Sequence, residues 1–281
     1  MGTLTLFFTM KLKLTDRQHK LLLEFQKRAY SFDWDDNILV MPTRIYLEKR
    51  VGDGWVPISV STEEFREVRK YLGNKYRYID NDPYKSFVDF RSYDAFLKDT
   101  KEALDKQSFG PSFEKFKEAL SYGSDFSIIT ARGNPPNAIK DAIKIIIDTI
   151  LSEEEKNQMK ANLYGTSVDQ YLNLQDYYPV SSDEFIKKFK IEGDSSDPEM
   201  AKTLALKDFV ERVVSEVKKI KDKPEYTGVS IGFSDDDMGN VEAAEKYIEE
   251  TLKGLYPDVS FLVYDTSDPK NPKKKRIIIK K

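Results

Sequence analysis

Short runs of β-favouring apolar residues alternate along the chain with segments whose apolar residues recur every three or four positions. Runs of the first kind end at Thr130, Asp235 and Tyr264, and each is long enough for a buried strand. A helical spacing connects Ile139, Ala142 and Ile145, and a second one runs on from Asp197 and Pro198. This alternation predicts strands and helices in turn, as in an open α/β protein.

The first half of the chain adds elements that interrupt this order. A helix is predicted behind Thr15 and Asp16, carrying Leu21, Leu22, Phe25 and Ala29. Residues 43–60 alternate about a Gly-Asp-Gly turn and predict a β-hairpin, a helix begins at Thr62, and residues 74–94 read as a loop. Helices follow at about 95–104 and 113–120. The segment between the acids around Asp33 and the next apolar run is roughly 80 residues long and has elements of its own. That is too long for an ordinary connection, so the segment is predicted to be an inserted module that could cover a site.

The later segments are less regular. Glutamates after Ser152 indicate a helix start, residues 161–164 suggest a short strand, and Ser181 with Glu184 fits a capping box. The basic tail, residues 270–281, could be a nuclear-localisation or RNA-binding patch. We favour a solvated tail or an edge strand protected by lysines.

Composition narrows the chemistry. The 281 residues contain no Cys and one His, His19, so disulfides, thiolate sites, multi-histidine metal sites and a Ser-His-Asp triad are all disfavoured. The formal net charge of -3 does not indicate steering of nucleic acid. The apolar run 4–8 is too short to span a membrane and lacks the marks of a signal peptide. We therefore expect a cytoplasmic protein without a membrane partner, whose chemistry uses carboxylates, hydroxyls and cationic side chains.

The stretch around Asp33, Asp35 and Asp36 concentrates three acids among apolar residues. Charges there suit a strand that emerges at the carboxyl edge of a sheet, where open α/β proteins bind ligands. In an extended chain Asp33 and Asp35 point the same way and could share Mg²⁺, or act as nucleophile and proton donor. The alternative is a solvated acidic turn.

Three later features each have an ordinary interpretation as well. Thr130 ends a predicted strand before a turn into a helix, which presents a hydroxyl and backbone N–H groups to an anion. Lys202 lies near the start of a long helix, where lysines are usually solvated. Asp235, Asp236 and Asp237 end another apolar run.

In this order, the four features resemble the motifs of the haloacid dehalogenase-like (HAD) hydrolase superfamily, and the resemblance covers residues 32–39, 127–132, a Lys within 202–207, and 229–240. It implies a Rossmann-like α/β core with a parallel sheet flanked by helices, formed by residues 1–40 and 122–281. Residues 41–121 would be an inserted α+β cap of the C1 type.

The resemblance also assigns roles. Asp33 matches the nucleophile that forms an aspartyl-phosphate, and Asp35 matches the general acid/base of the phosphatase branches, which argues against the dehalogenase branch. Thr130 matches the hydroxyl that binds the phosphoryl oxygens. Lys202 best matches the lysine of the third motif, with Lys207 as the alternative.

The metal site follows from the same resemblance. Asp235 and Asp236 match the pair that holds Mg²⁺ together with Asp33 and the carbonyl of Asp35. Asp237 stays open, because three consecutive acids do not define the register. Mg²⁺ and the lysine would offset the repulsion between a carboxylate nucleophile and a phosphate dianion.

Two neighbouring residues depart from the superfamily's usual pattern. Asp36 stands where Gly is frequent, and Asn37 where Thr or Val is usual. The expected activity is Mg²⁺-dependent hydrolysis of a small phosphomonoester. The alternatives are a nucleotide or nucleic-acid-end phosphatase, suggested by basic residues within 44–70, and a non-catalytic binding protein with the same fold.

Overall fold

A six-stranded, mostly parallel sheet forms the centre of the molecule in a computed structural model, which describes residues 27–191, 197–220 and 228–277. The spatial order of the strands is β6-β5-β1-β7-β8-β9. All neighbours are parallel except β8 and β9. Their bounds are β1 Lys27–Phe32, β5 Asp125–Thr130, β6 Asp176–Pro179, β7 Val229–Asp235, β8 Val259–Asp265 and β9 Lys273–Ile277.

β1 lies in the middle of the sheet, between β5 and β7. The chain adds β5 and β6 on one side of β1 and later adds β7 and β8 on the other, so the strand order reverses at β1. β5 and β7 are buried almost throughout, as strands covered on both faces should be. The carboxyl ends of β1, β5 and β7 therefore meet at a topological switch point, where open α/β sheets bind ligands.

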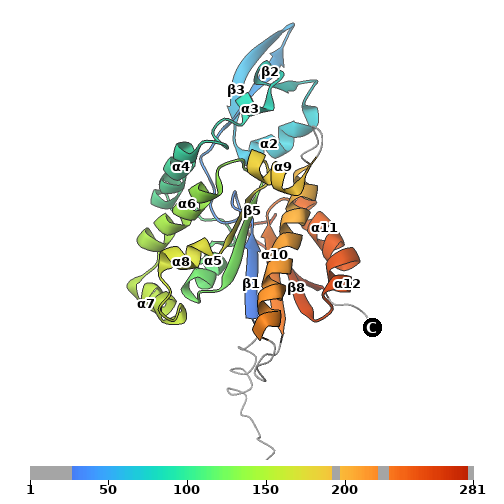
Figure 1. The fold of residues 1–281 in the computed structure, drawn as a ribbon. Coiled ribbons are helices and arrows are strands. Elements are labelled where there is room, and N and C mark those ends of the chain that lie inside the picture. Colours follow the sequence, from blue (N-terminus) through green and yellow to red (C-terminus); the bar gives the residue numbers. More distant parts are fainter. Residues whose placement is uncertain (1–26, 192–196, 221–227, 278–281) are drawn as a thin grey trace, which may run out of the picture.

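Helices cover both faces of the sheet (Figure 1). One apolar cluster joins five helices to one face, and a second joins the remaining long helices to the other. The first group is α4 Tyr93–Asp105, α5 Phe113–Ser121, α6 Pro136–Thr149, α7 Glu153–Asn162 and α8 Val168–Asn173. The second is α9 Asp183–Phe189, α10 Pro198–Ile220 and α11 Met238–Tyr247, which continues through a π-helical turn, Ile248–Leu252, into α12 Lys253–Leu255. The fold is thus a layered α/β structure compatible with a Rossmann-like architecture.

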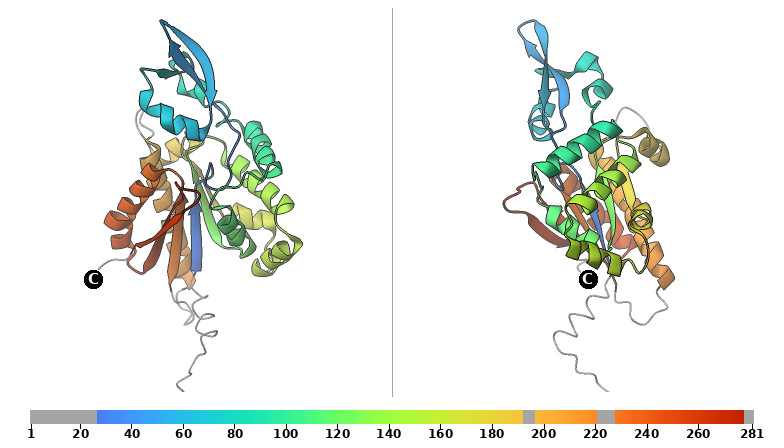
Figure 2. Two further views of the ribbon diagram at one scale, coloured as in Figure 1. Left: turned by 180° about the vertical axis from the view of Figure 1, so that it is seen from behind. Right: turned by 90° about the vertical axis from the view of Figure 1, so that its left-hand side faces the viewer.

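A separate three-stranded module, residues 45–91, projects from the carboxyl end of the sheet (Figure 2). Its apolar cluster is small and distinct from the two main ones. Because Phe96, Phe113 and Phe116 of α4 and α5 pack in a main cluster instead, the module is narrower than the predicted insertion 41–121. Its elements are β2 Ile45–Val51, β3 Gly54–Val60, α2 Thr62–Val68, β4 Tyr76–Tyr78, α3 Pro83–Ser86, and 3₁₀ turns at Arg69–Tyr71 and Ile79–Asn81.

Several local predictions are confirmed. The hairpin of β2 and β3 turns at Gly52, whose φ of +58° favours glycine. Asp197 caps α10, accepting a hydrogen bond from the Glu199 N–H, with Pro198 in the first turn. β9 is an antiparallel edge strand rich in lysine, as we favoured for the basic tail.

Of the helices that the structure describes, none is long and apolar enough to cross a membrane.

Other local predictions are wrong. Ala29 lies in β1, not on a helix, and residues 161–164 end α7 and turn. The missing strand of that region is β6, four residues long and too short to show a pattern. The predicted loop 74–94 contains β4 and α3, and α9 is capped by Ser182, one residue later than expected. The predicted helix behind Thr15, including His19, lies outside the described residues.

Candidate active site

A cleft of about 670 Å³ separates the carboxyl edge of the sheet from the three-stranded module. Residues of both units line it. All six predicted site residues are among them: Asp33, Asp35, Thr130, Lys202, Asp235 and Asp236. Lys207, the alternative to Lys202, instead pairs with Glu211 at 3.6 Å in a half-exposed position on α10. The structure thus brings together side chains that are up to 203 residues apart (from 33 to 236) in the chain.

Lys202 joins the ends of β1 and β7. Its Nζ donates to Asp33 Oδ1 at 2.7 Å and to Asp235 Oδ2 at 2.8 Å, and its side chain is only 4% exposed. Burial alone would lower the pKa of Lys202, but the two carboxylates raise it above its usual value. Lys202 is therefore a fixed positive charge at the centre of the site.

Asp33, Asp235 and Asp236 offer oxygen atoms that all lie within 4.8 Å of one another. Burial, followed by the repulsion of Asp235 and Asp236, outweighs Lys202 and raises the pKa of Asp33 well above its usual range. Burial and the neighbouring Asp235 raise the pKa of Asp236 to about 8. Such a crowded set of hard oxygen donors is chemically suited to Mg²⁺.

Asp235 is oriented on its remaining side by its own strand–helix junction. Its Oδ1 accepts hydrogen bonds at 3.0 Å from the Asp237 N–H and from Asn240 Nδ2. Asp237 in turn caps α11 by accepting from the Gly239 N–H. The third acid of this run thus has a structural task, although Asp237 also lines the cleft.

The carboxylate of Asp35 lies apart from this group because an arginine binds it. Arg132 Nε and Nη2 each donate to one oxygen of Asp35 at 2.7 Å. The expected convergence of the Asp33 and Asp35 carboxylates on one cation is therefore absent, since different cations bind them. A bidentate guanidinium–carboxylate pair is among the strongest polar contacts in proteins.

Arg132 is fully buried and contacts both ends of the three-stranded module. Thr43, just before β2, accepts a hydrogen bond from Arg132 Nη2 at 2.8 Å and donates to Asp99 at 2.7 Å. At the other end, the Phe90 ring lies 4.4 Å from the guanidinium carbon, with Phe96 of α4 at 4.8 Å. Arg132 thus links the orientation of Asp35 to the place where the module leaves and rejoins the core.

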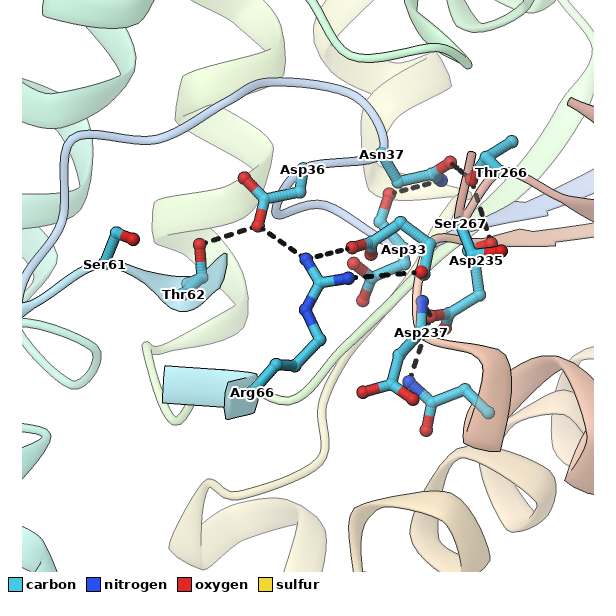
Figure 3. A network of polar contacts seen from close by, with 12 residues as sticks. Asp33, Asp36, Asn37, Ser61, Thr62, Arg66, Asp235, Asp237, Thr266 and Ser267 are labelled. Atoms are coloured by element: carbon cyan, nitrogen blue, oxygen red, sulfur yellow. Dashed lines mark hydrogen bonds and ion pairs between the residues drawn. The ribbon is translucent and has the colours of Figure 1, made fainter. Parts of the chain in front are cut away.

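Asp36, which the sequence left unexplained, attaches α2 to the core (Figure 3). Its φ is +56°, a left-handed conformation that turns the chain away from the strand direction. Its Oδ2 accepts from Thr62 Oγ1 at 2.7 Å and from Arg66 Nη2 at 3.1 Å. The same Arg66 nitrogen lies 2.8 Å from Asp236, so Arg66 bridges the acids after β1 and β7.

Asn37, the next residue in the chain, has a structural role in the core. Its Nδ2 donates to the carbonyls of Asp33 and Ser234, at 3.0 and 3.2 Å. Its Oδ1 accepts from the hydroxyls of Ser234 and Thr266, both at 2.9 Å. This buried amide ties the ends of β1 and β7 together and so fixes the spacing of Asp33 and Asp235.

Thr130 lies where it was predicted, buried at the end of β5 beside the cleft. Its hydroxyl accepts a long hydrogen bond, 3.4 Å, from the Arg132 N–H. Arg132 itself was missed as a site residue, and its only sequence signal is its place two residues after Thr130. Arg66 and Arg69 were noted only among the basic residues of the module.

No protein-family model matches this chain, and no match to a curated protein or to a solved structure was found.

Proposed function

We propose that the protein is a Mg²⁺-dependent phosphomonoester hydrolase of the HAD type, which acts through an aspartyl-phosphate on Asp33. One observation carries the proposal: Lys202 bridges Asp33 and Asp235 beside Asp236, at the switch point of a parallel sheet. The order of these residues along the chain resembles the superfamily. The three-stranded module lies within the segment where that superfamily inserts its C1 cap.

In the proposed reaction, one carboxylate oxygen of Asp33 attacks the phosphorus atom, and the bond to the leaving oxygen breaks. Lys202 occupies Asp33 Oδ1, so Oδ2 is the oxygen that we assign as the nucleophile. Asp35 protonates the leaving oxygen, then takes a proton from the water that hydrolyses the aspartyl-phosphate. The hydroxyl of Thr130 orients the phosphoryl group.

Asp33, Asp235 and Asp236 would hold Mg²⁺, whose chemistry is to neutralise the negative charge that the nucleophile and the phosphate bring together. With all three carboxylates ionised, Lys202 and Arg66 together leave one negative charge uncompensated, so the donor set fits a divalent cation. The positive charge of Lys202, bound to the other oxygen of the Asp33 carboxylate, adds to this neutralisation.

The contact between Asp35 and Arg132 adds a requirement to this scheme. A carboxylate with both oxygens bound to one guanidinium has no proton to deliver, so one oxygen must first be released and take up a proton from solvent. Arg132 is a positioning residue in this scheme, because it acts through Asp35. Since Thr43 and Phe90 hold Arg132 at the two ends of the module, we propose that movement of the module accompanies that release.

The test is hydrolysis of p-nitrophenyl phosphate with and without Mg²⁺, in the wild type and in Asp33→Asn. We expect activity that EDTA abolishes and that Asp33→Asn lowers by about 1,000-fold or more, as loss of a nucleophile does elsewhere. Asp105→Asn makes the same change at an exposed position of α4 and serves as the matched control.

Unchanged hydrolysis in Asp33→Asn would overturn the assignment of the nucleophile. Mg²⁺ binding without hydrolysis of any phosphomonoester would support the non-catalytic alternative instead.

A further inference from the structure

We infer that the module side of the cleft binds the base of a nucleoside phosphate, an inference that rests on the proposed function and specifies its substrate class. A volume of about 670 Å³ is of the size that holds drug-sized ligands and far exceeds the space that a phosphate group needs. Most of the cleft is therefore available to the rest of the substrate.

The module wall of the cleft is aromatic. Phe65, Tyr78 and Phe87 line it, and all three are only partly buried by the module's own cluster. The Phe87 ring lies 5.3 Å from Phe65 at nearly a right angle and 6.1 Å from Tyr78. Their unburied surfaces face the cleft, where a flat ring would remove them from water.

Tyr84 and Arg91 stack on each other in the same wall. The guanidinium carbon of Arg91 lies 4.0 Å from the centre of the Tyr84 ring. Tyr84 is 54% exposed, although it lines the cleft. The ion pair of Arg91 with the exposed Asp183 is long, 3.7 Å, and costs little to exchange. Aromatic rings and arginine planes are the surfaces on which proteins stack bases without reading their sequence.

The polar groups of this wall favour an anionic substrate with an aromatic base over a simple sugar phosphate. Among the described residues of the module, those lining the cleft include no Asp, Glu, Asn or Gln, which are the usual partners of sugar hydroxyls. Arg66, Arg69 and Arg91 supply positive charge there instead. Arg69 pairs with Asp237 at 3.2 Å but is 49% exposed, so its guanidinium can turn to a substrate oxygen at small cost.

Only some of the basic residues in the module line the cleft. Arg66 and Arg69 face the cleft, whereas Arg44, Lys49, Arg50 and Lys70, which prompted the same idea from the sequence, are not among its lining residues. The aromatic residues and Arg91, which the sequence did not single out, carry the inference.

The first experiment compares kcat/KM for adenosine 5′-monophosphate and for ribose 5-phosphate, two phosphomonoesters that differ only in the base. We expect the nucleotide to be favoured by about tenfold or more, since stacking on an aromatic side chain has effects of that size. Tyr84→Ala and Arg91→Ala should each reduce that ratio by at least about fivefold, mainly through KM. Tyr122→Ala and Arg50→Ala, at exposed positions outside the cleft, are the matched controls.

Further arms identify the source of the nucleoside phosphate. Oligonucleotides with a 5′- or 3′-terminal phosphate, compared with free mononucleotides, distinguish a polynucleotide end from a free nucleotide. Preference for either source over ribose 5-phosphate supports the inference. Equal kcat/KM for ribose 5-phosphate and for every nucleoside phosphate, or a preference that Tyr84→Ala and Arg91→Ala leave intact, would overturn it.

Binding measurements separate this inference from the proposed function. Isothermal titration of Asp33→Asn with adenosine 5′-monophosphate measures the base site without turnover. Binding that Tyr84→Ala weakens by about fivefold or more would uphold the inference even if no phosphomonoester is hydrolysed. Hydrolysis of generic phosphomonoesters with no measurable nucleotide binding would uphold the proposed function and refute the inference.

Discussion

The acids after β1 and the acids at the end of β7 form two groups of three that lie side by side at the carboxyl edge of the sheet, and the cations that bind them differ. Lys202 joins Asp33 to Asp235, and Arg66 joins Asp36 to Asp236. The lysine belongs to α10 of the core, whereas the arginine belongs to α2 of the three-stranded module. The remaining acid of each group pairs with a different arginine, Asp35 with Arg132 and Asp237 with Arg69.

The difference separates what the core builds alone from what depends on the module. Lys202 is buried and, with Asn37, fixes the spacing of β1 and β7 whatever the module does. Arg66 reaches the site from a short helix, which starts where Ser61 and Glu64 form a reciprocal capping box. The proposed nucleophile therefore has a rigid partner, and Asp236 has one that can leave with the module.

The largest expected effect comes from breaking the core pair. Lys202→Met leaves two buried carboxylates without their cation, and we expect the free energy of unfolding in EDTA to fall by about 3–5 kcal/mol at pH 8. The loss should shrink at acidic pH, because Asp33, with its raised pKa, is then protonated. Urea denaturation at both pH values measures it.

Lys207→Met is the matched control for that variant, on the same helix. Its ion pair with Glu211 is half-exposed and spaced i, i+4, so we expect a change within about 0.5 kcal/mol. Equal effects of the two variants would show that Lys202 has no special place in the core.

A smaller loss of stability is expected when Arg132, which binds Asp35, is replaced. Arg132→Met removes two hydrogen bonds to Asp35 and one to Thr43, and should lower the free energy of unfolding by about 2–3 kcal/mol. If Arg132 positions Asp35, kcat should fall with little change in KM, and the pH dependence of kcat should shift. Arg132→Lys keeps the charge without the planar fork, so it should restore stability more than kcat. A pH profile identical to that of the wild type would contradict the positioning role.

The acid group after β7 predicts a pH-dependent response to Mg²⁺. The pKa of Asp236 is raised to about 8 in the fold, so its ionisation costs stability, and metal-free protein should lose stability as pH rises through about 8. Mg²⁺ binds the ionised form, so at roughly ten times Kd it should contribute about 1.4 kcal/mol at pH 9 and much less at pH 6. Thermal unfolding with Mg²⁺ or EDTA measures this, and Asp236→Asn should reduce the dependence to the part that Asp33 contributes. An equal Mg²⁺ effect at both pH values would contradict the metal assignment.

Much of the site could be predicted because its residues stand where predicted elements end. Thr130, Lys202 and Asp235 follow strands or begin a helix, and parallel strands bring such ends to one edge. The local sequence is therefore enough to predict which residues lie at that edge. It does not predict which side chains bind each other: Arg132 and Asp35 are 97 positions apart, and nothing near either residue identifies the other.

The missed elements have a similar cause. β6 is four residues long and includes a proline, and β4 has three residues, so neither repeats often enough to show alternation. Both strands are stabilised by neighbours from other parts of the chain, β5 and β2. The cleft wall at Tyr84 and Arg91 follows from this tertiary pairing, which the sequence pattern does not contain.

The smallest expected effects distinguish the two arginines of the module. Arg66 lies 2.8 Å from Asp236 and competes with a cation there, so Arg66→Ala should tighten Mg²⁺ binding by about fivefold, the equivalent of roughly 1 kcal/mol. Arg69 pairs with Asp237, which is outside the three-carboxylate group, so Arg69→Ala should change the Mg²⁺ Kd by less than about twofold. Titration calorimetry with Mg²⁺ alone compares them. Weaker Mg²⁺ binding in Arg66→Ala would mean that this arginine holds Asp236 in place for the metal, and the module would then belong to the metal site.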